Sequence, residues 1–175
     1  MKSLALLPLT LALVLPAAAT DLVLNRTPAQ VFFSPRGGCT EAVVTALAGA
    51  RKSVLVQAYS FTSAPIAGAL KAAHDRGVDV RVILDRSQVG PRYTIARYLG
   101  HAGIPTWVDT VHGLAHNKVM ILDGRTVITG SFNFTKAAEE SNAENLLVLQ
   151  DPALAQLYTQ NWQARLARSA PVPVQ

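Results

Sequence analysis

The chain has 175 residues, of which 50% are hydrophobic and 15% charged; this length is typical of one domain, and the composition excludes an intrinsically disordered protein. Eleven glycines without a repeating period and a single cysteine exclude a collagen-like chain and a disulfide-rich scaffold. Lysine and arginine outnumber aspartate and glutamate by 16 to 11, and the net charge of +5 favours an anionic partner such as nucleic acid or a membrane surface.

The first nineteen residues have the pattern of a secretory signal peptide. A charged residue, Lys2, precedes an apolar run over 4–15, and Ala17 and Ala19 form a small-residue cleavage site. The run is too short for a membrane-spanning helix, which needs about 20 apolar residues. We therefore expect residues 1–19 to be removed and residues 20–175 to form one exported bacterial domain, either periplasmic or secreted.

Between residues 29 and 108, predicted strands alternate with predicted helices. Apolar and β-branched runs predict strands over 29–34, 53–61, 78–84 and 104–108. Alanine-rich or amphipathic stretches between them predict helices over 40–51, 63–76 and 91–101. Gly77 and Gly103 follow two of these helices, as expected at helix ends. The alternation indicates an α/β protein in which a sheet is covered by helices on both faces.

The pattern changes after residue 115. Two short strands are predicted over 118–122 and 126–129, and the Asp123 and Gly124 pair between them is a strong signal for a hairpin turn. A further strand over 144–149 and a last helix from 152 to about 168 follow. Pro171 and Pro173 indicate a frayed tail. No linker divides the chain, so we expect a single domain.

The residues that can carry chemistry flank this hairpin. Residues two apart in a strand share a face, so His116 and Lys118 are expected to project together, as are Ser131 and Asn133. The hairpin then brings a histidine, a cation and two neutral donors to one place. This set suits a tetrahedral anion that gains charge in its transition state, and phosphoryl transfer is the reaction that it favours.

The same stretch matches the H-x-K-x4-D-x6-G-S-x-N signature of the phospholipase D superfamily at every specified position, from His116 to Asn133. Together with its flanking segments, the chain resembles the small, exported, single-motif bacterial endonucleases of that superfamily. The resemblance implies an α/β/α sandwich with a mixed sheet. It also implies phosphodiester hydrolysis through a covalent phosphohistidine on His116, without a metal ion or another cofactor, and two motif copies in each active site.

The predicted site residues are the catalytic His116, Lys118, Asp123 and Glu144 and the phosphate-binding Lys118, Ser131 and Asn133. Glu144 enters through the resemblance, as an acid that orients His116; a plain carboxylate at a strand start is the alternative. Asp123 belongs to the signature, but its place beside Gly124 also suits a turn residue. We expect the role of Asp123 to be mainly structural within the site.

A single motif in the chain predicts a homodimer. In-line displacement places the nucleophile and the leaving group on opposite sides of phosphorus, so one His116 cannot both attack and protonate the departing oxygen. A two-fold dimer places His116 of each subunit across a shared site, one as nucleophile and the other as general acid. The resemblance implies the same arrangement. We expect no stable membrane anchor.

Three other features have simpler explanations than a functional site. His112 lies four residues before His116, but the loop context and the lack of an acid after it argue against a metal-binding pair. Cys39 has no partner for a disulfide within the chain. Phe132 and Phe134 are expected to pack in the core, not to stack on bases.

Three hypotheses about the substrate stay open. The first is a metal-independent endonuclease acting on DNA, with RNA as a further substrate, without sequence preference. Basic residues with interleaved tyrosines between 86 and 101 could follow a phosphate backbone, although ordinary solvated charge explains them almost as well. The alternative is a phospholipase D acting on phosphatidylcholine-type lipids, for which the sequence shows no exposed apolar loop. The third is a non-catalytic DNA-binding protein, which would not need His116.

Overall fold

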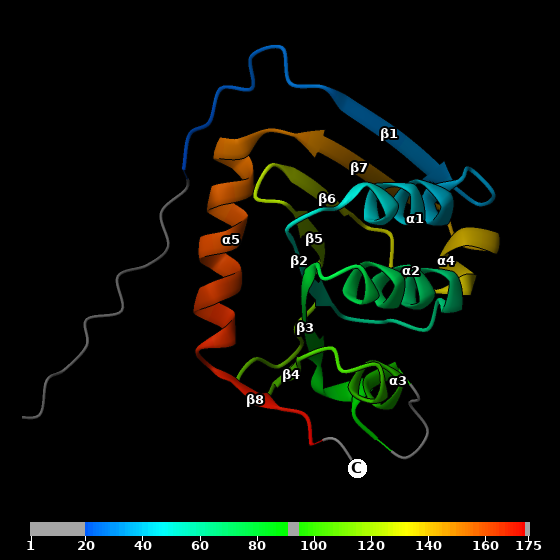
Figure 1. The fold of residues 1–175 in the computed structure, drawn as a ribbon. Helices are drawn as coiled ribbons and strands as arrows, with labels where there is room; N and C mark the ends of the chain where they lie inside the picture. The colour runs from blue at the N-terminus through cyan, green and yellow to red at the C-terminus, as the bar shows by residue number, and fades with distance from the viewer. Residues whose placement is uncertain (1–19, 91–94, 174–175) are drawn as a thin grey trace, which may run out of the picture.

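The structure is a computed structural model, and it describes residues 20–90 and 95–173. The predicted signal peptide lies outside the described residues, as does the predicted start of the third helix. The described chain folds around one sheet, with helices packed on either side of it (Figure 1).

The sheet has eight strands within the described residues. They are β1 (Ala29–Ser34), β2 (Ser53–Ala58), β3 (Asp79–Asp85), β4 (Thr106–Asp109), β5 (Lys118–Leu122), β6 (Thr126–Gly130), β7 (Glu144–Gln150) and β8 (Ser169–Pro171). Their spatial order is β1-β7-β6-β5-β2-β3-β4-β8. Strands β2, β3 and β4 run parallel, and every other neighbouring pair is antiparallel. The predicted mixed sheet is confirmed.

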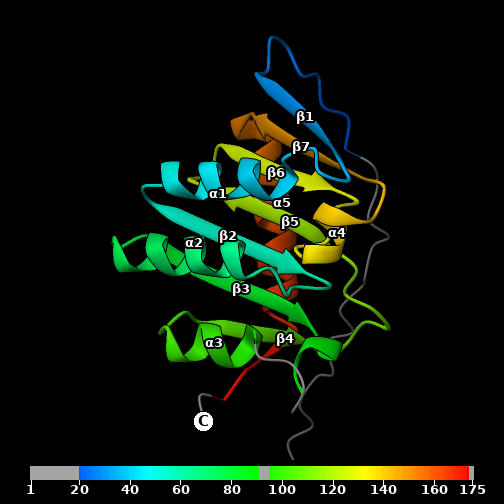
Figure 2. The same ribbon diagram turned by 90° about the vertical axis from the view of Figure 1, so that its right-hand side faces the viewer.

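Helices cover both faces of the sheet. Helices α1 (Cys39–Gly49), α2 (Ala64–Asp75) and α3 (Ile95–His101) lie on one face, and α5 (Pro152–Leu166) lies on the other (Figures 1 and 2). The short α4 (Lys136–Glu140) sits beside the end of the sheet (Figure 2). No helix in the described part of the chain is long and apolar enough to cross a bilayer. The arrangement confirms the predicted α/β/α sandwich.

The two helical layers explain why β5 is apolar at every position after Lys118. Met120 and Leu122 pack on the side of α1 and α2, and Val119 and Ile121 pack on the side of α5. The α5 side is anchored by Trp162, which is 1% exposed and donates a hydrogen bond to the Val56 carbonyl at 3.0 Å. Strands covered on both faces are apolar at successive positions, without polar alternation.

Several local predictions need correction. Of the two prolines predicted to mark a frayed tail, Pro171 instead ends β8, whose Ala170 pairs with Val108 of β4. The strand predicted to reach Phe61 ends at Ala58, and Phe61 forms an isolated bridge with Phe134. Helix α4 was not predicted, because five residues are too few to show a helical period. Phe132 and Phe134 are completely buried, so their predicted place in the core is confirmed.

Candidate active site

One edge of the sheet gathers the polar residues of the predicted site. Strand β2 ends there at Ala58, and its antiparallel neighbour β5 begins opposite it with Lys118. Strand β6 ends at the same edge with Gly130, while β7 begins there with Glu144. The hairpin therefore places the His116 segment and the segment that follows Gly130 side by side.

His116 lies two residues before the start of β5 and is contacted by Lys118 and Tyr59. The Lys118 Nζ atom lies 2.8 Å from His116 Nδ1 and 3.2 Å from Nε2, and it donates to the His116 carbonyl at 2.9 Å. The Tyr59 ring centroid is 4.3 Å from that of His116, and Lys118 Nζ is 5.1 Å from the Tyr59 centroid. Sequence reasoning missed Tyr59, whose one signal is its position directly after a buried strand.

Lys118 is a buried cation, with a relative exposure of 7%. Burial lowers the pKa of Lys118, and the Glu144 carboxylate opposes part of this effect. A charge held in a poorly solvated place interacts more strongly with an anion than a fully hydrated one does. Lys118 is thus suited to neutralise charge on a bound phosphate.

Glu144 and Ser131 form a hydrogen-bonded pair across β6 and β7. The Ser131 hydroxyl donates to Glu144 Oε2 at 2.6 Å, and the side-chain amide of Asn142 donates to Oε1 at 3.0 Å. Ser131 in turn accepts from the Asn145 amide at 3.1 Å. Among the described residues of the single chain, Glu144 makes no hydrogen bond with His116. Its contacts fix Ser131, and the orientation of His116 by Glu144, which the resemblance implies, stays a prediction.

The backbone of β7 leaves no room for a side chain at Gly130, and the side chain of Asn133 is partly buried. A Cβ atom added to Gly130 would lie 2.3 Å from the Asn145 carbonyl oxygen, so only glycine allows β6 to end this close to β7. The Asn133 Oδ1 atom is buried and has no hydrogen-bond partner among the described residues. The buried Phe132 and Phe134 fix the backbone on either side of Asn133.

Asp123 lies at the other end of β5. Five residue steps of about 3.3 Å separate it from Lys118, so the two are roughly 16 Å apart along the strand. Its carboxylate accepts hydrogen bonds from the backbone amides of Arg51, Lys52 and Ser53 at 2.7 to 3.2 Å. Asp123 and Gly124 both have positive φ angles, 54° and 64°, which form the hairpin turn. The structure thus separates Asp123 from His116 and gives it a structural role.

Replacing Asp123 by asparagine is expected to destabilise the protein in a pH-dependent way. Burial raises the pKa of Asp123, but the three backbone donors outweigh it and leave the pKa below the usual 3.8. A lowered pKa contributes stability that is present above the unfolded-state pKa and is lost as pH falls through the folded-state pKa. Asp123→Asn should therefore lower the free energy of unfolding by about 1–3 kcal/mol at pH 7.

The loss should shrink between pH 4 and pH 2, as urea denaturation at several pH values would measure. Asp75→Asn is the matched control, since Asp75 makes an exposed pair with Lys71 and its loss should cost less than about 1 kcal/mol. An equal loss at pH 7 and pH 3 for Asp123→Asn would contradict this explanation.

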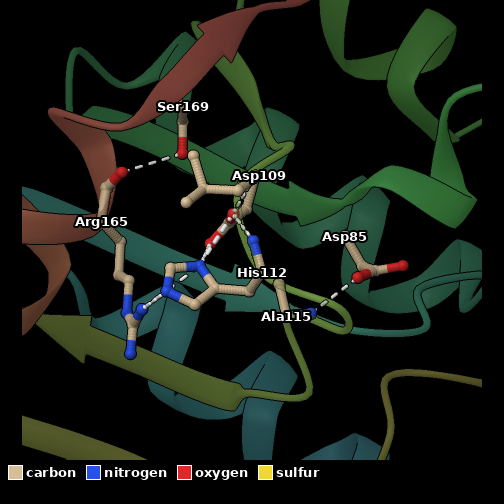
Figure 3. A network of polar contacts seen from close by, with 7 residues as sticks. Asp85, Asp109, His112, Ala115, Arg165 and Ser169 are labelled. Carbon is tan, nitrogen blue, oxygen red and sulfur yellow. Dashed lines mark hydrogen bonds and ion pairs between the residues drawn. The ribbon is translucent and has the colours of Figure 1, made fainter.

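His112 does not join His116. Its Nδ1 atom lies 2.8 Å from Asp109 Oδ2, and its Nε2 atom faces the Arg165 guanidinium (Figure 3). No group of three or more histidine, cysteine, aspartate or glutamate side chains in the described part of the chain is arranged to hold a metal ion.

Comparisons with known proteins agree with this geometry. Residues 43–166 match the family model described as cardiolipin synthase, PLD-like domain. A protein of Rickettsia bellii named phospholipase D is 43% identical over 146 residues, which cover 83% of this chain and 73% of the relative. Two solved structures have the same fold. Nuc from Salmonella typhimurium, described as a phospholipase D family member, is 40% identical with a TM-score of 0.80 and covers 84% of this chain and 99% of its own. NucT from Helicobacter pylori is 26% identical with a TM-score of 0.77 and covers 84% and 100%.

Proposed function

Since the chain belongs to the phospholipase D superfamily and is a phosphodiesterase, we propose that it is a metal-independent endonuclease that cleaves DNA, with RNA as a further substrate, through a phosphohistidine on His116. The observation that carries the proposal is the placement of the His116 ring 2.8 Å from the buried Lys118 ammonium, at the edge of the sheet. A nucleophile beside a fixed cation is the arrangement that phosphoryl transfer needs.

In the proposed reaction, a His116 ring nitrogen attacks phosphorus, so that a P–N bond forms as the P–O bond to the leaving group breaks. Lys118 neutralises the charge that develops on the phosphoryl oxygens, and Ser131 and Asn133 help to position them. The leaving oxygen takes a proton from a general acid on the far side of phosphorus. Water, activated by the same group acting as base, then hydrolyses the P–N bond and releases His116.

The group on the far side is proposed to be His116 of a second subunit. Each chain contributes one motif, and a two-fold axis through the site would place the two histidines on opposite sides of one phosphorus. The proposal therefore includes a homodimer with a shared active site. It also includes export of the protein, on the pattern of its first nineteen residues.

Exposed cations around the site support a nucleic-acid substrate. Arg36 follows β1, Arg86 follows β3 and Lys136 begins α4, all at the edge where His116 lies, and all three side chains are exposed. Cations that surround a phosphodiester site can contact the neighbouring phosphates of a polynucleotide. A lipid with a single phosphodiester headgroup offers no neighbouring phosphate for them to contact. The names Nuc and NucT of the two structural neighbours agree with this choice.

One observation favours phospholipids as a second candidate substrate. Val111 and Leu114, in the loop over 110–117 that leads to His116, are 58% and 59% exposed. The expectation that the chain has no exposed apolar loop is therefore wrong. Apolar side chains beside the site could enter a lipid surface. Several relatives that match the chain, such as that of Rickettsia bellii, bear the name phospholipase D.

A substrate comparison separates the candidates. The purified protein would be incubated with supercoiled plasmid DNA and with phosphatidylcholine vesicles, each in excess chelator. Nicking that survives chelation and disappears in His116→Ala is the expected result. Choline release without nicking would overturn the nuclease in favour of the lipase, and binding of DNA without turnover would favour a non-catalytic protein. A Val111→Ser, Leu114→Ser double variant should leave nicking unchanged but lower any choline release.

A further inference from the structure

Two buried aspartates outside the motif lie at the same edge of the sheet as His116. Asp85 ends β3 and Asp109 ends β4, and they are register partners in the parallel pair. Their relative exposures are 0% and 3%. Burial of a carboxylate costs free energy unless hydrogen bonds satisfy it. The hydrogen-bond donors of Asp85 and Asp109 therefore identify the segments that these two side chains fix in place.

Asp85 holds the residue that precedes His116. One carboxylate oxygen accepts from the Ser87 amide at 2.9 Å. The other accepts from the Ala115 amide at 2.7 Å (Figure 3). On the other side of His116, the Asn117 carbonyl accepts from the Tyr59 amide at 2.9 Å. The backbone is thus fixed immediately before and immediately after His116.

Asp109 holds the first part of the same loop. Its Oδ1 atom accepts from the amides of Val111 at 3.0 Å and His112 at 3.2 Å, and its Oδ2 atom accepts from His112 Nδ1 at 2.8 Å. Arg165 of α5 donates to His112 Nε2, which fits the tautomer that carries its proton on Nδ1. Figure 3 shows His112 between the carboxylate and the guanidinium.

The hydrogen-bond network connects the loop over 110–117 to α5 and β8. The Arg165 carbonyl accepts from the Ser169 hydroxyl at 2.9 Å, and Ser169 pairs with Asp109 where β8 joins β4. Burial raises the pKa of each aspartate, but hydrogen bonds outweigh it and leave both pKa values below the usual 3.8: those from Ser87 and Ala115 for Asp85, and those from His112 and Val111 for Asp109. Both carboxylates are therefore charged acceptors at neutral pH.

We propose that Asp85 and Asp109 are positioning residues that hold the loop over 110–117 in one conformation, so that His116 is aligned for attack before the substrate binds. The inference rests on the proposed role of His116 as nucleophile. Alignment of this kind matters because a misplacement of about 1 Å in a reacting group can cost roughly 100-fold in rate. Neither aspartate touches the reacting atoms.

The first test is the Asp85→Asn variant with bis(p-nitrophenyl) phosphate as substrate. Asparagine offers one acceptor oxygen where Asp85 offers two, so either Ser87 or Ala115 loses its partner. We expect kcat to fall about 10- to 100-fold while KM changes less than about twofold, because the alignment of His116 is lost but the phosphate-binding groups stay. Asp79→Asn, at the opposite end of β3, is the matched control and should change neither constant.

Amide hydrogen exchange gives a readout that is independent of turnover. The Ala115 amide should exchange faster in Asp85→Asn than in the wild type, while core amides of β3 keep their protection. His112→Phe, which removes the side-chain contacts with Asp109 and Arg165, should lower kcat by about 3- to 10-fold and provides a second variant if Asp85→Asn does not fold.

Wild-type kcat in folded Asp85→Asn, or unchanged exchange at Ala115, would overturn the inference. Equal turnover by the wild type and His116→Ala would overturn the proposed function and the inference with it, so the two failures are distinguishable. If Asp85→Asn lowers kcat and KM rises in proportion, the residue acts on binding and the positioning role is wrong.

Discussion

The His116→Ala variant is expected to lose phosphodiester cleavage by about 10,000-fold or more in kcat, because it removes the group that forms the covalent bond to phosphorus. His116 precedes β5, and the backbone is held on both sides of it, so removal of the ring should not disturb the core. Steady-state hydrolysis of plasmid DNA and of a chromogenic phosphodiester would measure the loss.

A trapping experiment tests for the covalent P–N bond between His116 and phosphorus. Rapid quenching of the wild type with a phosphorus-labelled substrate should leave label on the protein that is stable in base and released in acid, as a P–N bond is. His116→Ala should carry no label. His74→Ala is the matched control, since His74 lies in α2 near its C-terminal end, and it should keep full activity. Label on the protein without His116 would place the nucleophile elsewhere.

A mixed dimer of one wild-type chain and one His116→Ala chain is expected to be at least about 100-fold less active than the wild-type dimer. If the two histidines act on one phosphorus, the mixed dimer lacks either its nucleophile or its general acid, and a general acid alone contributes about 100- to 10,000-fold. The two chains would be co-produced with different affinity tags and the mixed species isolated through both tags.

Independent active sites would give a different activity of the mixed dimer. If each chain carries a complete site, the mixed dimer should keep about half of the wild-type activity, since its sites are independent. A dimer of wild type with His74→Ala, prepared in the same way, should keep full activity and controls for the tags. A fully active monomer in solution would contradict the shared site directly.

Local patterns were sufficient for the layered fold. Apart from the short α4, alternating apolar runs and amphipathic stretches predicted the strands and helices in the correct order up to α5, because each depends on neighbours within one element. The Asp123 and Gly124 pair predicted the hairpin, because a tight turn requires positive φ angles that few residues adopt. Strand β8 was missed because three residues carry no period, and only pairing with β4 makes them a strand.

The sequence by itself determined the chemistry of the candidate site, because the motif fixes residue types at fixed spacing and a hairpin needs only local contacts to bring its ends together. Tertiary structure alone decided what surrounds His116. The Tyr59 ring packs against it from the end of β2, and Asp85 fixes the preceding backbone amide from the end of β3. These contacts join residues 30 or more positions apart, and they exist because parallel strands end at one edge of the sheet. No local sequence pattern predicts which strands become neighbours in the sheet. The contacts of Tyr59 and Asp85 around His116 could therefore be seen only in the folded chain.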